Sequence, residues 1–368
     1  MLENSTITIH EIIERNARAG LNYQRNDGSF PPGENYPYGE SITPVRHTSA
    51  WARILAKAYE ITNERVFAEA ANQALDYLLS SDVRPYGYTF YCRDVTDKCN
   101  GLVGQARAIQ ALVYAGDILN RSDALKAAEE VFMLHPFDES IGLWECVEID
   151  GSRLSFDRTL NHQITFAAAA ADLDIAQNCV SQFLTNLGSN MQLHSDGLIK
   201  HYIRPPVTKV LNTVITNPKH YNLLINEFVS IYYDRSEKRR LKEKGYHITN
   251  LLSLSLIKEA IPGHSVWECE KISKSLSFLE RNREVIAHDE ENKYGHPVKA
   301  ICEAIVQHKF GKKSIESISY AISSNIADCI SNKDNLEIHI GSDSGEYLGE
   351  IRRTHLLLGL PNFEIELS

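Results

Sequence analysis

The chain has 368 residues, of which 43% are hydrophobic and 23% are charged, as is typical of a soluble globular protein. Its formal net charge is −10 and no basic stripe offsets it, which argues against a protein that binds nucleic acid. No apolar segment approaches the length that spans a bilayer, so we expect no membrane partner.

The residue pattern also indicates the compartment and argues against cofactors. The start, MLENSTITIH, lacks a basic region followed by an apolar core, which argues against a signal peptide. Seven cysteines are scattered without a CxxC pair, so we expect reduced thiols in a cytoplasmic protein. The sequence has no HExxH, P-loop, GxSxG or dinucleotide-binding motif, and we expect neither a metal nor a cofactor.

Helical apolar spacing recurs along most of the chain. It predicts helices over residues 8–22, 45–62, 64–80, 100–120, 123–132, 161–173, 175–187, 221–243, 246–260, 266–281, 296–310 and 313–330. Ser122 is a candidate cap for the helix that follows it. A hairpin is expected to turn at Asp150-Gly151, and the connection 188–219 has room for two short strands. After Leu336 the segments LEIHIG, EYLGEI and NFEIEL alternate as strands do.

Two classes of helix alternate in this series. Small-sided helices follow loops rich in glycine and aromatic residues, and they start near Pro44, Asn100, Asn161, Gly245 and Gly295. The others have longer side chains on one face, as expected of helices that cover a core. This alternation predicts an all-α fold, an (α/α)6 toroid with the small-sided helices innermost. We expect it to span residues 1–335, with a β-containing tail, 336–368, packed on it. An open helical solenoid is the alternative.

The most crowded inner helix is expected at the alanine run Ala167–Ala171, because alanine lets neighbouring helices approach closely. The loops before the inner helices carry the groups that a sugar site needs. Aromatic faces come from residues 86–91, Trp51 and Trp144. Carboxylates come from Asp94, Asp97, Glu145, Glu148 and Asp157, and two of them would serve glycosidic cleavage. Guanidinium groups that suit a uronate carboxylate come from Arg46, Arg93 and Arg158.

The stretches DKCNGLVGQARAIQAL and DRTLNHQITFAAAAADL, with GESITPVRHTSAWARILAKAYEIT, resemble the six-hairpin glycosidase superfamily over about residues 8–331. The likeness is greatest to unsaturated uronyl hydrolases and N-acylglucosamine 2-epimerases. The first group implies an acid/base Asp before an inner helix, for which Asp157 is the nearest match, although Asn161 stands where the acid is expected. The second implies a histidine pair, for which His162 and His247 are candidates.

These observations predict a carbohydrate-active enzyme that acts on a sugar or uronate, with glycoside hydrolysis by acid/base catalysis as the first choice. A sugar epimerase or isomerase and a non-catalytic glycan- or protein-binding toroid are the alternatives. The predicted catalytic residues are Asp157, with a pKa raised by apolar surroundings, Asp97 and His162. The predicted substrate-binding residues are Arg46, His47, Tyr86, Tyr88, Asn100, Trp144, Glu145, Arg158, Asn161 and His247. We expect Arg46, Tyr88, Asn100 and Trp144 to share one concave wall. The sequence leaves open whether the chain forms a homo-oligomer.

Overall fold

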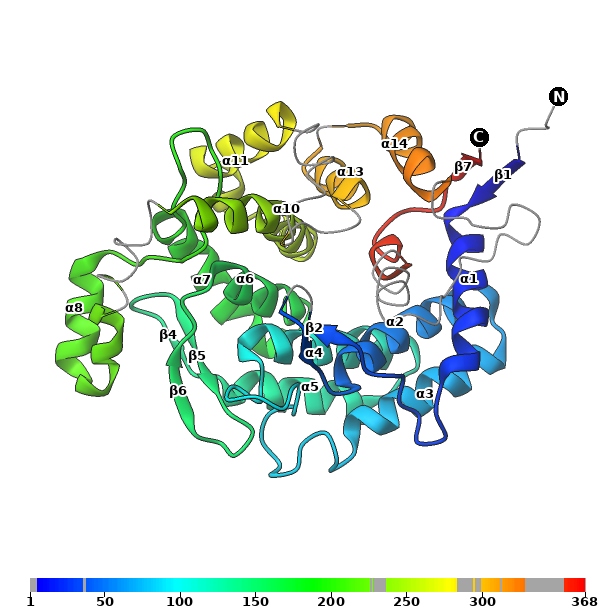
Figure 1. Ribbon diagram of the computed structural model, residues 1–368, viewed down its shortest axis with the longest axis horizontal. Helices are drawn as coiled ribbons and strands as arrows, with labels where there is room; N and C mark the ends of the chain where they lie inside the picture. Colours follow the sequence, from blue (N-terminus) through cyan, green and yellow to red (C-terminus); the bar gives the residue numbers. More distant parts are fainter. Residues whose placement is uncertain are drawn as a thin grey trace.

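The computed structural model describes residues 5–35, 38–225, 227, 236–282, 294, 299–311, 313–327 and 354–367. Within these ranges the chain is mostly helical, and helices around a central axis alternate along the sequence with helices on the outside (Figure 1). The architecture is the α/α toroid predicted from the sequence.

The inner ring is formed by the small-sided helices. Among the described residues these are α2 (Val45–Thr62), α4 (Gly101–Ile118), α6 (Leu160–Ala169), α10 (Glu237–Ala260) and α13 (Lys299–Lys309). Each contacts the next in that order. All five alanines of the run Ala167–Ala171 are buried, which confirms that this segment lies inside the protein. The helix itself ends at Ala169, two residues before the run does.

Amphipathic helices cover the ring. The outer helices α3 (Arg65–Leu79), α5 (Ser122–Leu134), α11 (Glu270–Arg281) and α14 (Ile315–Ala327) contact α2, α4, α10 and α13 in turn. The outer helix α7 (Gln177–Asn190) follows α6 and the 3-10 turn η2 (Asp174–Ala176), and it contacts the 3-10 turn η4 (Ser265–Glu268). In α3 the buried residues recur every three or four positions, so one stripe faces the core. Ser122 is the first residue of α5 and makes no capping hydrogen bond, so the predicted cap is wrong.

The two ends of the chain meet. Strand β1 (Ser5–Thr8) pairs antiparallel with β7 (Glu364–Leu367), and Figure 1 shows the two strands side by side. Helix α1 (Ile9–Gly20), which continues into the 3-10 turn η1 (Leu21–Tyr23), packs on α2. Inside α1, the buried Asn16 amide donates a hydrogen bond to Thr354 Oγ1 at 2.8 Å. A helical turn at 354–357 therefore sits next to α1. The proposed boundary at 335/336 and the segments LEIHIG and EYLGEI lie outside the described residues, so the division into two parts stays a prediction.

Short sheets shape the loops at one end of the ring. Strands β4 (Phe137–Asp138), β5 (Leu143–Val147) and β6 (Arg153–Phe156) form an antiparallel sheet, and β2 (Glu34–Asn35) pairs with β3 (Glu40–Ser41). The β5–β6 connection turns through Asp150-Gly151, where Gly151 has φ +85°, so the predicted hairpin is confirmed.

Two predictions for the second half of the chain are wrong: a helix start at Gly245 and two strands in the connection 188–219. A third, the helix start near Gly295, lies outside the described residues. Gly245 does not start a helix but lies inside α10. A side chain there would meet the backbone of Tyr294, so the glycine marks a close approach. The connection 188–219 contains isolated bridges, helix α8 (Val207–Thr216) and the 3-10 turn η3 (Pro218–Tyr221) instead of two strands. None of the described helices combines the length and apolar character that crossing a bilayer requires.

Candidate functional site

A cavity of about 390 Å³ opens along the axis of the ring. Its wall combines residues of the inner helices α2, α4, α6 and α10 with residues of the loops before α2, α4 and α6. Five of the predicted site residues lie in this wall: Arg46, Asp97, Asn100, Asn161 and His162. The sequence therefore predicted five residues that line the cavity, and their role as a functional site stays a prediction.

The start of α6 supplies a carboxylate–histidine pair. Asp157 Oδ2 accepts a hydrogen bond from His162 Nδ1 at 2.7 Å, and Asp157 Oδ1 accepts one from the backbone N–H of Thr159 at 3.0 Å. Asp157 does not line the cavity itself, whereas His162 does. An ionised carboxylate can only accept, so Nδ1 carries the proton and Nε2 is left to take one up. The pair therefore presents an oriented imidazole to the cavity.

The charge state of Asp157 differs from the prediction. Burial opposes the negative charge of Asp157. The charge and hydrogen bond of His162, together with hydrogen bonds from the backbone N–H groups of Thr159 and Leu102, outweigh this effect. The net result is a lowered pKa of Asp157. The expectation of a raised pKa is wrong, because polar donors converge on this carboxylate. Such a carboxylate suits the orientation of a histidine better than the donation of a proton.

Gly101 provides a test of this pair. It adopts φ +58°, and a Cβ at this position would lie 2.9 Å from Asp157 Oδ2 and 3.1 Å from His162 Nδ1. We expect Gly101→Ala to reduce turnover by about tenfold or more, because it displaces the pair as well as straining the backbone. Gly87→Ala is the matched control, since Gly87 has φ +77° and open space around it. Equal turnover in both variants, measured with a substrate found as described below, would contradict the assignment.

One arginine joins two carboxylates in the wall. Arg93 donates to Glu40 Oε2 at 2.8 Å and to Asp97 Oδ2 at 3.0 Å, and all three residues line the cavity. Asp97 Oδ1 also accepts from the N–H of Gly101 at 3.2 Å, which ties the loop to the start of α4. These carboxylates are therefore held in an ion-paired arrangement.

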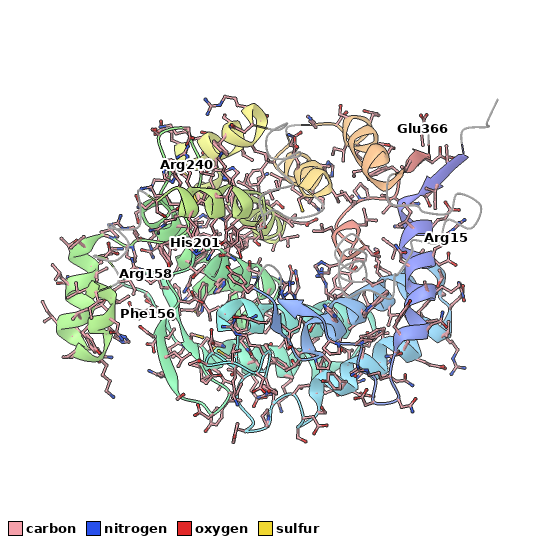
Figure 2. The ribbon with its side chains drawn as sticks, in the orientation of Figure 1. Arg15, Phe156, Arg158, His201, Arg240 and Glu366 are labelled. Carbon is pink, nitrogen blue, oxygen red and sulfur yellow. The ribbon has the colours of Figure 1, made fainter. Side chains whose placement is uncertain are left out.

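A second histidine in the wall was not predicted. His201 is buried. Its backbone N–H donates to Glu243 Oε1 in α10 at 2.9 Å, and its backbone carbonyl accepts from the N–H of Leu160 in α6 at 2.9 Å. Figure 2 shows it beside these two helices. Burial, and then the positive charges of Lys242 and His162, lower the pKa of His201 to about 3. A neutral imidazole thus lies near His162. His201 lies in the connection 188–219, where no sequence motif indicates a site residue.

An aromatic cluster forms another part of the wall. Lys242 Nζ lies 5.8 Å from the ring centroids of Tyr38 and Tyr246 and 5.9 Å from that of Tyr294. All four residues line the cavity. Flat rings beside a cation suit a sugar ring that carries negative charge. The three tyrosines lie far apart in the sequence, so only the closed ring brings them together.

The C-terminal segment contributes His355 to the cavity. The buried Arg53 of α2 donates to His355 Nε2 and, at 3.0 Å, to Gln110 Oε1 of α4. Burial, and then Arg107, oppose the charge of Arg53, while Tyr114 favours it, and the net effect lowers the pKa of Arg53 to about 10. Since His355 and Gln110 both line the cavity, the chain end is part of the site.

Seven further predicted site residues do not line the cavity: His47, Tyr86, Tyr88, Trp144, Glu145, Arg158 and His247. Tyr86 and Tyr88 are exposed, 63% and 43%, on an outer loop, whereas Trp144 is buried on β5 among four phenylalanine rings. The prediction that Tyr88 and Trp144 share a wall with Arg46 and Asn100 is therefore wrong. All five residues of β5 are buried, so this strand faces the core on both sides.

The remaining four are held by partners inside the protein. Arg158 forms a buried ion pair with Glu227, and Glu145 is buried with His220 Nε2 3.8 Å away. His47 Nδ1 donates to the Pro31 carbonyl at 2.8 Å.

His247 bridges two backbone groups. It donates to the Ser275 carbonyl at 3.0 Å and accepts from the Ile199 N–H at 3.3 Å. Burial lowers the pKa of His247 to about 4. It thus occupies the core, and the histidines of the described cavity wall are His162, His201 and His355.

Within the described residues, one group has the spacing of metal ligands. The side-chain donor atoms of Asp97, Cys99 and Cys146 lie within 4.8 Å of one another. Cys99 Sγ donates to Asp97 Oδ1 at 3.0 Å and lies 3.5 Å from Cys146 Sγ. The contact with Cys146, followed by burial, raises the pKa of the Cys99 thiol, which favours its neutral form. A hydrogen-bonded thiol and an ion-paired carboxylate account for this cluster.

Solved structures show the same fold. The chain is similar to an unsaturated glucuronyl hydrolase specific for heparin, with 11% identity, a TM-score of 0.50, and coverage of 96% of this chain and 83% of that one. It is also similar to a mannosidase of glycoside hydrolase family 76 from Bacteroides thetaiotaomicron VPI-5482, with 12% identity, a TM-score of 0.51, and coverage of 95% and 98%. At this identity the likeness shows the six-hairpin glycosidase-like fold alone.

A sequence relative gives the family, although no family model matches the chain. The archaeal glycosylation protein Q of Haloferax volcanii is 40% identical over 303 residues, which cover 79% of this chain and 81% of that protein. The match extends over most of both chains. The chain therefore belongs to the family of archaeal glycosylation protein Q.

Proposed function

We propose that this chain is a carbohydrate-active enzyme that moves a proton on a sugar or uronate, as an isomerase or epimerase. The observation that carries this proposal is the His162 imidazole, which Asp157 orients and which lines the cavity. A second, neutral imidazole at His201 lies in the same wall. This arrangement favours the alternative prediction over hydrolysis.

The chemistry starts with an open-chain sugar whose carbonyl lies next to a C–H bond. His162 Nε2 takes that proton, the C–H electron pair forms the carbon–carbon double bond, and the carbonyl oxygen becomes negatively charged. The enediolate and the imidazolium then form side by side, and Asp157 stabilises the imidazolium. Return of the proton to the neighbouring carbon, with a hydroxyl proton passing between the oxygens, gives the isomer. Delivery of a solvent proton to the opposite face of the same carbon, with loss of the first proton from His162 to solvent, gives the epimer.

The cavity wall supports an anionic sugar as the substrate. Arg46, Arg107 and Lys242 add positive charge to it, and a guanidinium can bind a carboxylate through two hydrogen bonds. Tyr38, Tyr246 and Tyr294 supply flat faces for a ring. The relative from Haloferax volcanii is named as a glycosylation protein, which agrees with a sugar substrate.

Glycoside hydrolysis is the second candidate. It needs two carboxyl groups that flank the bond, one as acid and one as base or nucleophile. Glu40 and Asp97 are the two carboxylates of the described cavity wall, which favours this candidate. Both carboxylates are bound to the guanidinium of Arg93, so neither is positioned as a protonated acid. Hydrolysis is therefore the weaker candidate.

A substrate panel separates these candidates. The purified protein is incubated with free aldoses and hexuronates and with oligosaccharides that contain mannose or uronate residues, and proton NMR follows the products. A new isomer without release of reducing ends supports our proposal. Release of reducing ends without isomerisation contradicts it and supports hydrolysis. Binding by calorimetry without any turnover also contradicts it and supports a glycan-binding toroid.

A further inference from the structure

Hydrophobic side chains gather on one exposed segment outside the cavity. Of the fifteen large hydrophobic side chains that the described residues expose, five lie between Val207 and Ile225. Three of them, Val207, Leu211 and Ile215, are 56%, 42% and 76% exposed. Their spacing of four residues puts them on one stripe of α8. Tyr221 and Ile225 follow in the adjoining turns. Such a concentration differs from the scattered apolar residues of an ordinary surface.

The opposite stripe of α8 holds the helix on the protein. Val210 and Thr213 are buried, and Thr213 Oγ1 lies 3.3 Å from Ser140 Oγ. Lys209 Nζ donates to Asn186 Oδ1 at 2.9 Å. The helix lies at the outer edge of the molecule, on the far side of the β4–β6 sheet from the ring axis (Figure 1). It thus has one apolar face against the protein and a second against solvent.

The η3 turn is anchored in the same way. The His220 ring lies 4.7 Å from that of Phe156, which Figure 2 places at this edge of the molecule. The carbonyl of the buried Leu223 accepts a hydrogen bond from Arg158 at 3.4 Å. The segment is therefore attached to the fold, and its outward apolar side chains are not the result of a loose end.

The charge of this segment differs from that of the whole chain. The protein has 48 acidic residues, but none lies between Gly197 and Ile225, a stretch that contains Lys200, Arg204, Lys209 and Lys219. Arg204 is ion-paired with Glu227 and Lys209 is bound to Asn186, whereas Lys219 is exposed next to the apolar stripe. An apolar stripe that has an exposed lysine beside it and no acidic residue in its own stretch is complementary to an anionic apolar interface.

We propose that α8 and the η3 turn rest on an anionic lipid bilayer, with Val207, Leu211 and Ile215 in the headgroup region. The helix projects from the molecule, so it can enter an interface without a groove to receive it. A second copy of this chain would bring like charges together, which disfavours a symmetric contact. This surface contact differs from a spanning segment, and as a proposal it departs from the expectation that the chain has no membrane partner.

The test is flotation of the full chain with vesicles of phosphatidylcholine alone, or with about one third phosphatidylglycerol. We expect binding to the anionic vesicles and about tenfold weaker binding to the neutral ones. The variant Leu211→Gln/Ile215→Gln should lose about tenfold or more of the affinity, because two apolar side chains no longer leave water. The matched control is Val66→Gln/Ile175→Gln, which changes two exposed apolar side chains elsewhere, 42% and 46% exposed, and should bind as the wild type does.

Three results would overturn the proposal. The first is a wild-type protein that binds neither vesicle. The second is an equal loss of binding in the α8 variant and in the control. The third is a wild-type dimer by light scattering that the α8 variant converts to monomers, with no vesicle binding, since a second copy would then cover this face. Circular dichroism verifies that both variants are folded.

Discussion

Replacing His162 by glutamine is expected to lower turnover by about 10²- to 10⁴-fold, because the variant cannot take up the proton. Glutamine keeps a polar group of similar size, so the cavity and the fold should persist. The measurement is kcat on the substrate found in the panel, with circular dichroism as a check of folding. His308→Gln is the control, since His308 lies at the end of α13 and does not line the cavity. Wild-type turnover in His162→Gln would exclude His162 as the base.

Asp157→Asn separates orientation from proton transfer. In our account Asp157 is a positioning residue, so its loss should reduce kcat more than it changes KM. The pH dependence of kcat should also change, because the imidazolium formed during turnover loses its neighbouring negative charge. A variant with lower stability but an unchanged pH profile would indicate a structural role only.

Trp144→Ala is expected to destabilise the protein by about 3–5 kcal/mol, because it leaves a large void between packed rings. Trp144 is 1% exposed, and the rings of Phe137 and Phe183 lie 4.6 and 5.2 Å away. Urea unfolding measures this change. Tyr86→Ala is the control, since Tyr86 is 63% exposed, and it should stay within about 0.5 kcal/mol of the wild type. A stable Trp144→Ala protein that no longer binds the sugar would contradict this account and indicate that Trp144 binds substrate.

The ring could be predicted from the sequence because crowding selects small side chains. The buried run Ala167–Ala171 and the helix that starts after Asn100 both show this selection. The same pattern, a glycine before small side chains, gave a wrong helix start at Gly245. This glycine lies inside α10, where it allows close contact with the Tyr294 backbone, and the sequence does not distinguish the two cases. Helix α8 was missed since its solvent side is also apolar, which hides the amphipathic pattern.

The site could be predicted only in part. The start of an inner helix identifies where a loop lies, and this was enough for Asn161 and His162. It does not determine which way a side chain points, so Trp144 was placed in the cavity although β5 is buried on both faces. His201 and His355 come from segments without a motif, and only the closure of the ring brings them to the wall.

The measurement that tests the proposed proton transfer most directly is turnover in deuterium oxide, followed by NMR of the recovered sugar. We predict that wild-type protein introduces deuterium at the carbon next to the carbonyl as the isomer or epimer forms, because the histidine proton exchanges with solvent. His162→Gln should introduce none, whereas His308→Gln should match the wild type. Products that carry no deuterium on carbon and appear together with new reducing ends would contradict the account and identify a hydrolase.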